Sequence, residues 1–137
     1  KDSVRNAIET GVFTWNLASR DLAEPMNQSS TMQSINEFEF SKLTPIAGQL
    51  IAAPRVGESH ASIECKVTKH FQLTDHEGKL LDTWMVLGEA VAVHIDPDLI
   101  KDDIYHCAPG RTILSGGGPG DSYELTDATL FDRRRPK

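Results

Sequence analysis

Long hydrophobic runs, an excess of positive charge and paired cysteines are all missing from this sequence. No apolar stretch approaches the roughly 20 residues that a membrane-spanning helix requires. The formal net charge is −6, which argues against a general nucleic-acid-binding protein, because such proteins rely on cationic surfaces. The basic run Arg133–Arg135 is too short to change that conclusion and is interpreted as part of a solvated tail.

Cysteine is limited to Cys65 and Cys107, which do not form a CxxC motif. Cys65 falls in a strand-like pattern, so we interpret it as a small buried hydrophobe rather than a nucleophile or metal ligand. Few cysteines and no leader-like segment favour a reducing, cytoplasmic setting. The proportions of hydrophobic residues (39%) and charged residues (25%) are ordinary for one globular domain of 137 residues.

The common catalytic signatures are also absent. The glycine-rich segment Ser115–Asp121 lacks the Gly-Lys-Ser/Thr ending of a phosphate loop and is interpreted as an ordinary loop. There is no GxSxG elbow, and the five histidines show no metal-binding spacing, so we predict no metal site. His94, in an apolar segment, is either a proton donor or a hydrogen-bonded core histidine. No catalytic side chain is predicted, which favours redox chemistry carried by a cofactor.

The first residues of the chain combine charge with a helix start. Ser3 is a suitable N-cap, and Lys1 adds a positive charge near the free N–H groups of the first turn. Together they are compatible with a phosphate or carboxylate site. The alternative is an ordinary cap beside a solvated terminus. A ligand site on the first three residues also leads us to expect further residues upstream.

The remaining patterns predict short helices around a few strands. We expect a helix from about Ser3 to Thr10, ended by Gly11, and then a strand through residues 13–17. Ser19 is a candidate cap for a second helix that is short or kinked at Pro25. A third short helix is expected at residues 36–40, and a loop at residues 43–56.

The clearest pattern is a long hairpin formed by Ser62–Leu73 and Thr83–Ile95, with its turn near Gly78. The second strand is apolar at nearly every position, so we expect it to lie deeper in the sheet. Gly88 indicates a bulge or a close backbone approach. Three strands cannot close a barrel, so further strands must come from upstream sequence or from a second subunit.

Several segments, in order, resemble the flavin reductase-like family of FMN-binding split-barrel proteins, of the type found as reductase components of two-component monooxygenases. The start is similar to the family pattern K-D-[ST]-x-x-N, and the segment EFEFSKLTP is similar to E-F-x-x-x-G-L-T-P, with Lys42 in place of glycine. The resembling segments are Lys1–Asn6, Phe13–Leu17, Leu22–Ser30, Glu37–Pro45, Pro54–Ser59 with Glu64–Cys65, and Val86–Ile95.

The resemblance implies a mainly β fold with peripheral helices (α+β), an antiparallel split β-barrel that binds FMN at or near a homodimer interface. It implies one domain over residues 1–137, lacking the family's N-terminal portion, with an irregular extension from about residue 99. It also implies that Lys1 and Ser3 hold the FMN phosphate, and that Asn16, Asn27 and Ser29 lie at the edge of the flavin ring site.

Three functions follow from the resemblance. The first is an NAD(P)H-dependent flavin reductase that supplies reduced flavin to a monooxygenase component. The second is an FMN-binding or flavin-carrier protein without significant turnover. The third is a truncated fragment with no flavin site. The sequence does not choose between NADH and NADPH, or between FMN, FAD and riboflavin.

Overall fold

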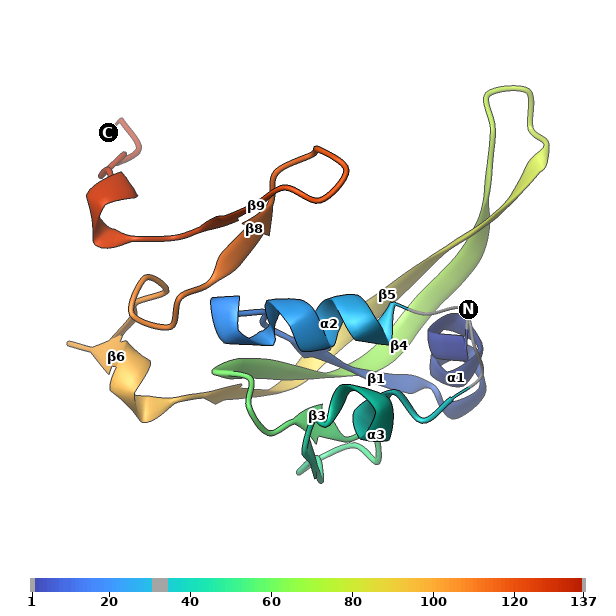
Figure 1. The fold of residues 1–137 in the computed structure, drawn as a ribbon. Coiled ribbons are helices and arrows are strands. Elements are labelled where there is room, and N and C mark those ends of the chain that lie inside the picture. Colours follow the sequence, from blue (N-terminus) through green and yellow to red (C-terminus); the bar gives the residue numbers. More distant parts are fainter. Residues whose placement is uncertain (1, 31–34, 137) are drawn as a thin grey trace.

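The central feature of the fold is a three-stranded antiparallel sheet. A computed structural model describes residues 2–30 and 35–136 of the chain. Strands β1 (Val12–Asn16), β4 (Ala61–Thr74) and β5 (Leu80–Ile95) pair in the order β1-β4-β5. Figure 1 shows the β4–β5 hairpin extending well beyond the helices to its turn. The hairpin and its turn at Gly78 (φ +86°) confirm the prediction.

The first helix, α1 (Asp2–Thr10), contacts all three strands of the sheet. It buries Ala7 and ends at Gly11, as predicted. Because the helix already includes Asp2, Ser3 lies inside its first turn and is not its N-cap, which corrects the expected role of this residue. Ser3 is therefore exposed on the helix surface.

The second helical segment starts as the 3-10 turn η1 (Arg20–Leu22) and continues as α2 (Ala23–Ser29). Ser19 occupies the N-cap position of η1, but its side chain makes no capping hydrogen bond. Pro25 lies in the first turn of α2, where the missing N–H has no intrahelical acceptor to lose. The helix is accordingly short rather than kinked.

The third helix, α3 (Glu37–Ser41), is capped by Asn36, whose side chain accepts a hydrogen bond from the N–H of Phe38. It ends at Lys42, which has left-handed backbone angles (φ 55°, ψ 34°). This conformation favours glycine, the residue found here in the pattern that the sequence resembles. The predicted loop that follows contains only the two-residue strands β2 (Pro45–Ile46) and β3 (Arg55–Val56).

Gly88 on β5 accommodates a close approach, as predicted. A Cβ atom at this position would lie 2.6 Å from Cε1 of Phe13 and 3.0 Å from Cβ of Cys65. The strand pairing shifts register between Val67 and Lys69, opposite this site. Cys65 is buried, and its burial raises the pKa of the thiol, which agrees with an unreactive packing role.

The expectation that β5 lies deeper in the sheet is wrong. The central strand is β4, which pairs with both neighbours, whereas β5 pairs only with β4 among the described residues. Most β5 side chains are exposed. The apolar sequence of β5 therefore reflects surface that the described residues leave uncovered, and not depth within this sheet. The three strands do not close into a barrel.

The C-terminal segment contains short irregular elements, as expected. These are η2 (Pro97–Leu99), β6 (Ile100–Lys101), β7 (Ile104–Tyr105), β8 (Ile113–Ser115), β9 (Ser122–Glu124) and η3 (Asp127–Thr129). The glycine-rich segment forms the loop between β8 and β9. Arg111 forms an ion pair with Asp21 of η1 at 2.8 Å, which connects this region to the N-terminal half of the chain. It forms a second ion pair with Glu124 of β9 at 2.9 Å. Within the described ranges, no helix has the length and apolar character needed to cross a bilayer.

Replacing Lys42 by glycine should stabilise the protein by about 0.5–1 kcal/mol, because glycine adopts the left-handed conformation without the Cβ penalty. The measurement is the free energy of unfolding from urea denaturation. Lys42→Ala is the matched control, since it removes the charge and keeps the Cβ atom. An equal gain in both variants would mean that charge, and not backbone strain, limits stability here.

Candidate functional site

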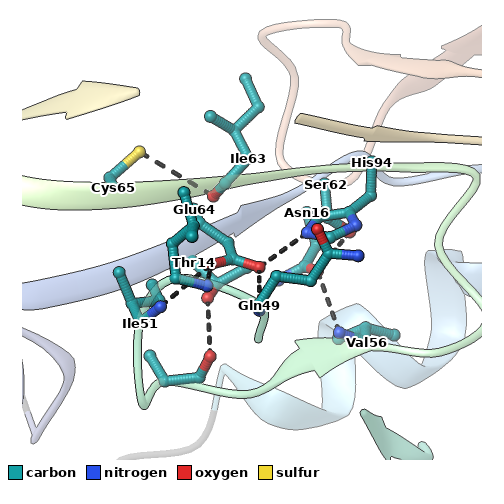
Figure 2. Close-up of polar contacts among 12 residues, drawn as sticks. Thr14, Asn16, Gln49, Ile51, Val56, Ser62, Ile63, Glu64, Cys65 and His94 are labelled. Atoms are coloured by element: carbon teal, nitrogen blue, oxygen red, sulfur yellow. Dashed lines mark hydrogen bonds and ion pairs between the residues drawn. The ribbon is translucent and has the colours of Figure 1, made fainter. Parts of the chain in front are cut away.

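A polar layer lies between the sheet and the loop at residues 49–56. Thr14 and Asn16 of β1 pair directly with Glu64 and Ser62 of β4, and Ser62 pairs with His94 of β5. These side chains therefore share one face of the sheet. Glu64 and Ser62 have no exposed surface. Figure 2 shows them meeting the loop that contains Gln49 and Ile51.

The Glu64 carboxylate holds one end of this loop. Its Oε1 accepts hydrogen bonds from the backbone N–H of Gln49 and from Nε2 of His94, both at 2.7 Å. Its Oε2 accepts from the N–H groups of Leu50 at 2.8 Å and Ile51 at 3.1 Å. The Gln49 N–H is the main reason that the pKa of Glu64 falls to about 2, against the opposing effect of burial. The group is therefore an anion at neutral pH.

The hydrogen bond to Glu64 favours the second of the two roles predicted for His94, that of a hydrogen-bonded core histidine. Because Glu64 is ionised and can only accept, Nε2 of His94 carries the proton of their hydrogen bond. The side chain is largely buried, with 15% of its surface exposed. His94 is a hydrogen-bonded core histidine in this structure.

The other end of the loop is held by β1. Oδ1 of Asn16 accepts from the N–H of Val56 and from the hydroxyl of Ser62, both at 2.9 Å. Thr14 donates to the carbonyl of Ala53 at 3.2 Å. The acceptor atom of Asn16 is thus occupied by contacts that shape the loop, which gives this residue a positioning role in the fold.

Gly48 allows the loop to approach the carboxylate. A Cβ atom at Gly48 would lie 2.6 Å from the carbonyl oxygen of Ile51 and 3.3 Å from Cδ of Glu64. Contacts this short require backbone atoms to move, so a larger residue at this position is incompatible with the observed loop.

A cavity of about 400 Å³ lies between α1 and the same loop. Its lining combines polar side chains at Ser3 and Asn6 with apolar surface at Phe13 and Pro54. Ser3 and Asn6 are three residues apart in a helix and so share a face. Within residues 2–30 and 35–136, neither side chain has a hydrogen-bonding partner. Lys1 lies outside the described residues.

The structure does not bring the other predicted residues to this cavity. Asn27 and Ser29 lie near the C-terminal end of α2, and Ser29 donates its hydroxyl to the carbonyl of Met26 at 2.7 Å. Neither residue is among those lining the α1 cavity. Asn16, three positions along the chain from Phe13, also does not line it. Ser3 is therefore the only described member of the predicted set that faces this cavity.

A second cavity, of about 470 Å³, is lined by other residues of the loop and shares no lining residue with the first. Its lining is mainly polar and includes Arg55, His60, His94 and Asp96. Over the described part of the chain, no group of three or more histidine, cysteine, aspartate or glutamate side chains is placed to hold a metal ion.

The defining pattern of the flavin reductase like domain family matches residues 1–112. The chain belongs to the flavin reductase-like family of split-barrel proteins, which confirms the family and the fold expected from the sequence. The described residues supply part of such a barrel, built from antiparallel strands with few helices.

The solved structures that this chain is similar to include nitrilotriacetate monooxygenase component B from Bacillus cereus (26% identity, TM-score 0.82, covering 97% of this chain and 65% of that one). Another is the 2-nitrobenzoate 2-nitroreductase NbaA from Pseudomonas fluorescens (25% identity, TM-score 0.78, covering 99% and 64%). An uncharacterised protein of Aquifex aeolicus is 28% identical over 76% of this chain and 50% of its own length. The chain spans about half the length of this relative.

Two features of the site were missed by reasoning from sequence. Asn6 was part of the quoted N-terminal pattern, and its spacing from Ser3 would have placed both on one helix face. Glu64 is a polar residue within the predicted strand Ser62–Leu73, and no role was predicted for it. Its burial has no local signal, because its partners lie in a loop 13–15 residues upstream and on β5.

Replacing Glu64 by glutamine should lower the thermal midpoint at neutral pH by roughly 5–10 °C, because the amide cannot accept all four hydrogen bonds as an anion does. The folded pKa lies below the ordinary value of 4.5. The carboxylate therefore contributes its full stability above about pH 4.5 and loses it as pH falls toward 2.

The midpoint difference between wild type and Glu64→Gln should consequently shrink across this pH window, as followed by circular dichroism. Glu77→Gln, in the exposed hairpin turn, is the control and should leave the thermal midpoint nearly unchanged. A difference that is constant from pH 6 to pH 2 would contradict the ionised state assigned to Glu64.

Proposed function

We propose that this chain is the FMN-binding part of an NAD(P)H-dependent flavin reductase that supplies reduced flavin to a partner monooxygenase. Family membership supports the oxidoreductase class. The likeness to a monooxygenase component B supports the kind of partner. We further propose that residues 1–137 form one domain, with an irregular extension from about residue 99.

The observation that carries this proposal is the α1 cavity. Ser3 and Asn6 present unpaired polar groups on one side, within the described residues, and Phe13 and Pro54 present apolar surface on the other. FMN has the same division between a phosphate and a ring system. The volume of about 400 Å³ is in the range of small-molecule sites. The residues present therefore fit part of FMN.

In this proposal Lys1 and Ser3 bind the phosphate. Lys1 makes a charge-assisted contact, and Ser3 donates its hydroxyl from the first turn of the helix. Asn6 adds an amide on the same face. Asn16, Asn27 and Ser29 remain proposed at the edge of the ring site, with Asn16 acting through the loop that it holds. Bound FMN would supply the hydride-accepting chemistry. The protein side chains bind, orient and exclude water.

Homodimerisation is part of the proposal. The hairpin exposes large apolar side chains, and the outer edge of β5 has no partner strand among the described residues. Surfaces of this kind are usually covered. The exposed apolar residues of the hairpin include Phe71, Leu80, Leu81, Trp84, Met85 and Leu87. A second copy of the chain would cover them.

Replacing Lys1 by glutamate should weaken FMN binding at least tenfold, about 1.4 kcal/mol, because an attractive contact with the phosphate becomes repulsive. Ser3→Ala should weaken it by a smaller factor. The measurement is titration calorimetry with FMN. Lys79→Glu carries the same charge change at the exposed hairpin turn and should leave FMN affinity unchanged. Equal affinities for Lys1→Glu and wild type would refute the phosphate assignment.

NAD(P)H consumption with added FMN separates the reductase from a protein that only carries flavin. A reductase consumes nicotinamide in proportion to enzyme concentration, whereas a carrier binds FMN without turnover. Failure to bind FMN at all would exclude both. NADH and NADPH are compared at equal concentrations, which also assigns the preferred co-substrate.

FMN should raise the thermal midpoint and the dimer fraction together, because a ligand that binds only the dimer stabilises the dimer. At an FMN concentration 100 times the dissociation constant this stabilisation is about 2.7 kcal/mol. Light scattering at micromolar concentration measures the mass. Leu87→Glu should reduce both the dimer fraction and FMN affinity, with Lys79→Glu as control. A monomeric protein with FMN bound would show that the interface is not needed.

A further inference from the structure

Arg55 is a half-buried cation that forms no ion pair among the described residues. It lies on the two-residue strand β3, opposite Ile46 of β2. Its Nε atom is buried and has no hydrogen-bond acceptor among the described residues. No carboxylate within residues 2–30 and 35–136 forms an ion pair with it. A buried guanidinium N–H without an acceptor is costly, so its position calls for an explanation.

The cavity beside Arg55 is built from polar side chains. Its volume is about 470 Å³, and Gln49, Ser59, His60, His94 and Asp96 line it together with Arg55. Each of these side chains comes from the loop at residues 49–56, the following turn, or the end of β5. The cavity therefore offers hydrogen-bonding groups around one cation.

The carboxylates near this cavity already accept hydrogen bonds from other groups. Asp96 meets Nδ1 of His60 at 3.2 Å through Oδ2 and accepts the N–H of Asp98 through Oδ1 at 3.1 Å. Glu64, behind His94, has no exposed surface and is occupied by three backbone N–H groups. Neither contacts Arg55, so the charge of the guanidinium is left for a ligand.

We propose that Arg55 binds an oxyanion, the phosphate or carboxylate group of a small-molecule ligand, in this cavity. The Nε–H and a neighbouring Nη–H of arginine form a planar fork that matches two oxygens of such a group. The site is separate from the cavity proposed for the flavin, because the two share no lining residue. It does not depend on the flavin assignment.

Two-dimensional ¹H–¹⁵N NMR of the arginine Nε–H groups tests the site directly. Inorganic phosphate and acetate are the two probes, titrated separately at constant ionic strength. We expect a saturable shift of the Arg55 Nε–H signal, which is assigned by its loss in Arg55→Gln. A response to phosphate alone identifies a phosphate-bearing ligand, and a response to acetate alone identifies a carboxylate. Absence of a saturable shift with both probes overturns the proposal.

Matched variants separate binding from folding. Arg55→Gln should raise the dissociation constant of the responding anion at least tenfold, and Arg55→Lys severalfold, because lysine keeps the charge and loses the fork. Arg134→Gln, at an exposed arginine paired with Asp132, should bind as wild type does. Calorimetry with the same anion measures these constants. Equal affinities for Arg55→Gln and wild type would overturn the proposal.

Thermal midpoints show whether each variant is folded. If Arg55→Gln is unfolded, anion affinity is compared between Arg55→Lys and wild type instead. FMN affinity of the folded Arg55 variant should stay within twofold of wild type. A loss of FMN binding in parallel with anion binding would show a single shared site and overturn the separation proposed here. Failure of FMN to bind wild type would affect only the flavin proposal.

Discussion

The buried carboxylate of Glu64 is the interaction on which this structure depends. One ionised side chain with no exposed surface accepts three consecutive backbone N–H groups and the imidazole of His94. Burial of a charge is costly unless hydrogen bonds replace the lost water, and here they do. Because residues of the loop at 49–56 line both cavities, the contacts of this carboxylate with the loop help to shape both.

The interior beneath the loop is polar where an apolar core would be expected. Ser62 and Glu64 are the most buried side chains, and the apolar surfaces of the hairpin are exposed. The sheet thus uses one face for hydrogen bonds to a loop and leaves much of its apolar surface available for packing. This division is in keeping with a split barrel whose described residues make up only part of the barrel.

Local patterns predicted the elements and failed at long-range contacts. The hairpin, its turn at Gly78, the helix ended by Gly11 and the close approach at Gly88 each have a signal within a few residues. The depth of β5 was wrongly predicted, because an apolar run does not distinguish a central strand from an edge strand that packs elsewhere. Ser3 lines the α1 cavity, although it is not the cap that was predicted. The burial of Glu64 depends on partners that sequence spacing does not indicate, and the missing acceptor at Arg55 Nε has no local signal either.

The loop at residues 49–56 depends on the assembled sheet for the hydrogen bonds that hold it. Its contacts come from Thr14 and Asn16 on β1 and from Glu64 on β4, with His94 of β5 completing the carboxylate's shell. The contact between Val56 and Asn16 spans 40 residues. The loop lines both cavities, so loss of pairing at any one of the three strands would remove a contact that shapes both of them.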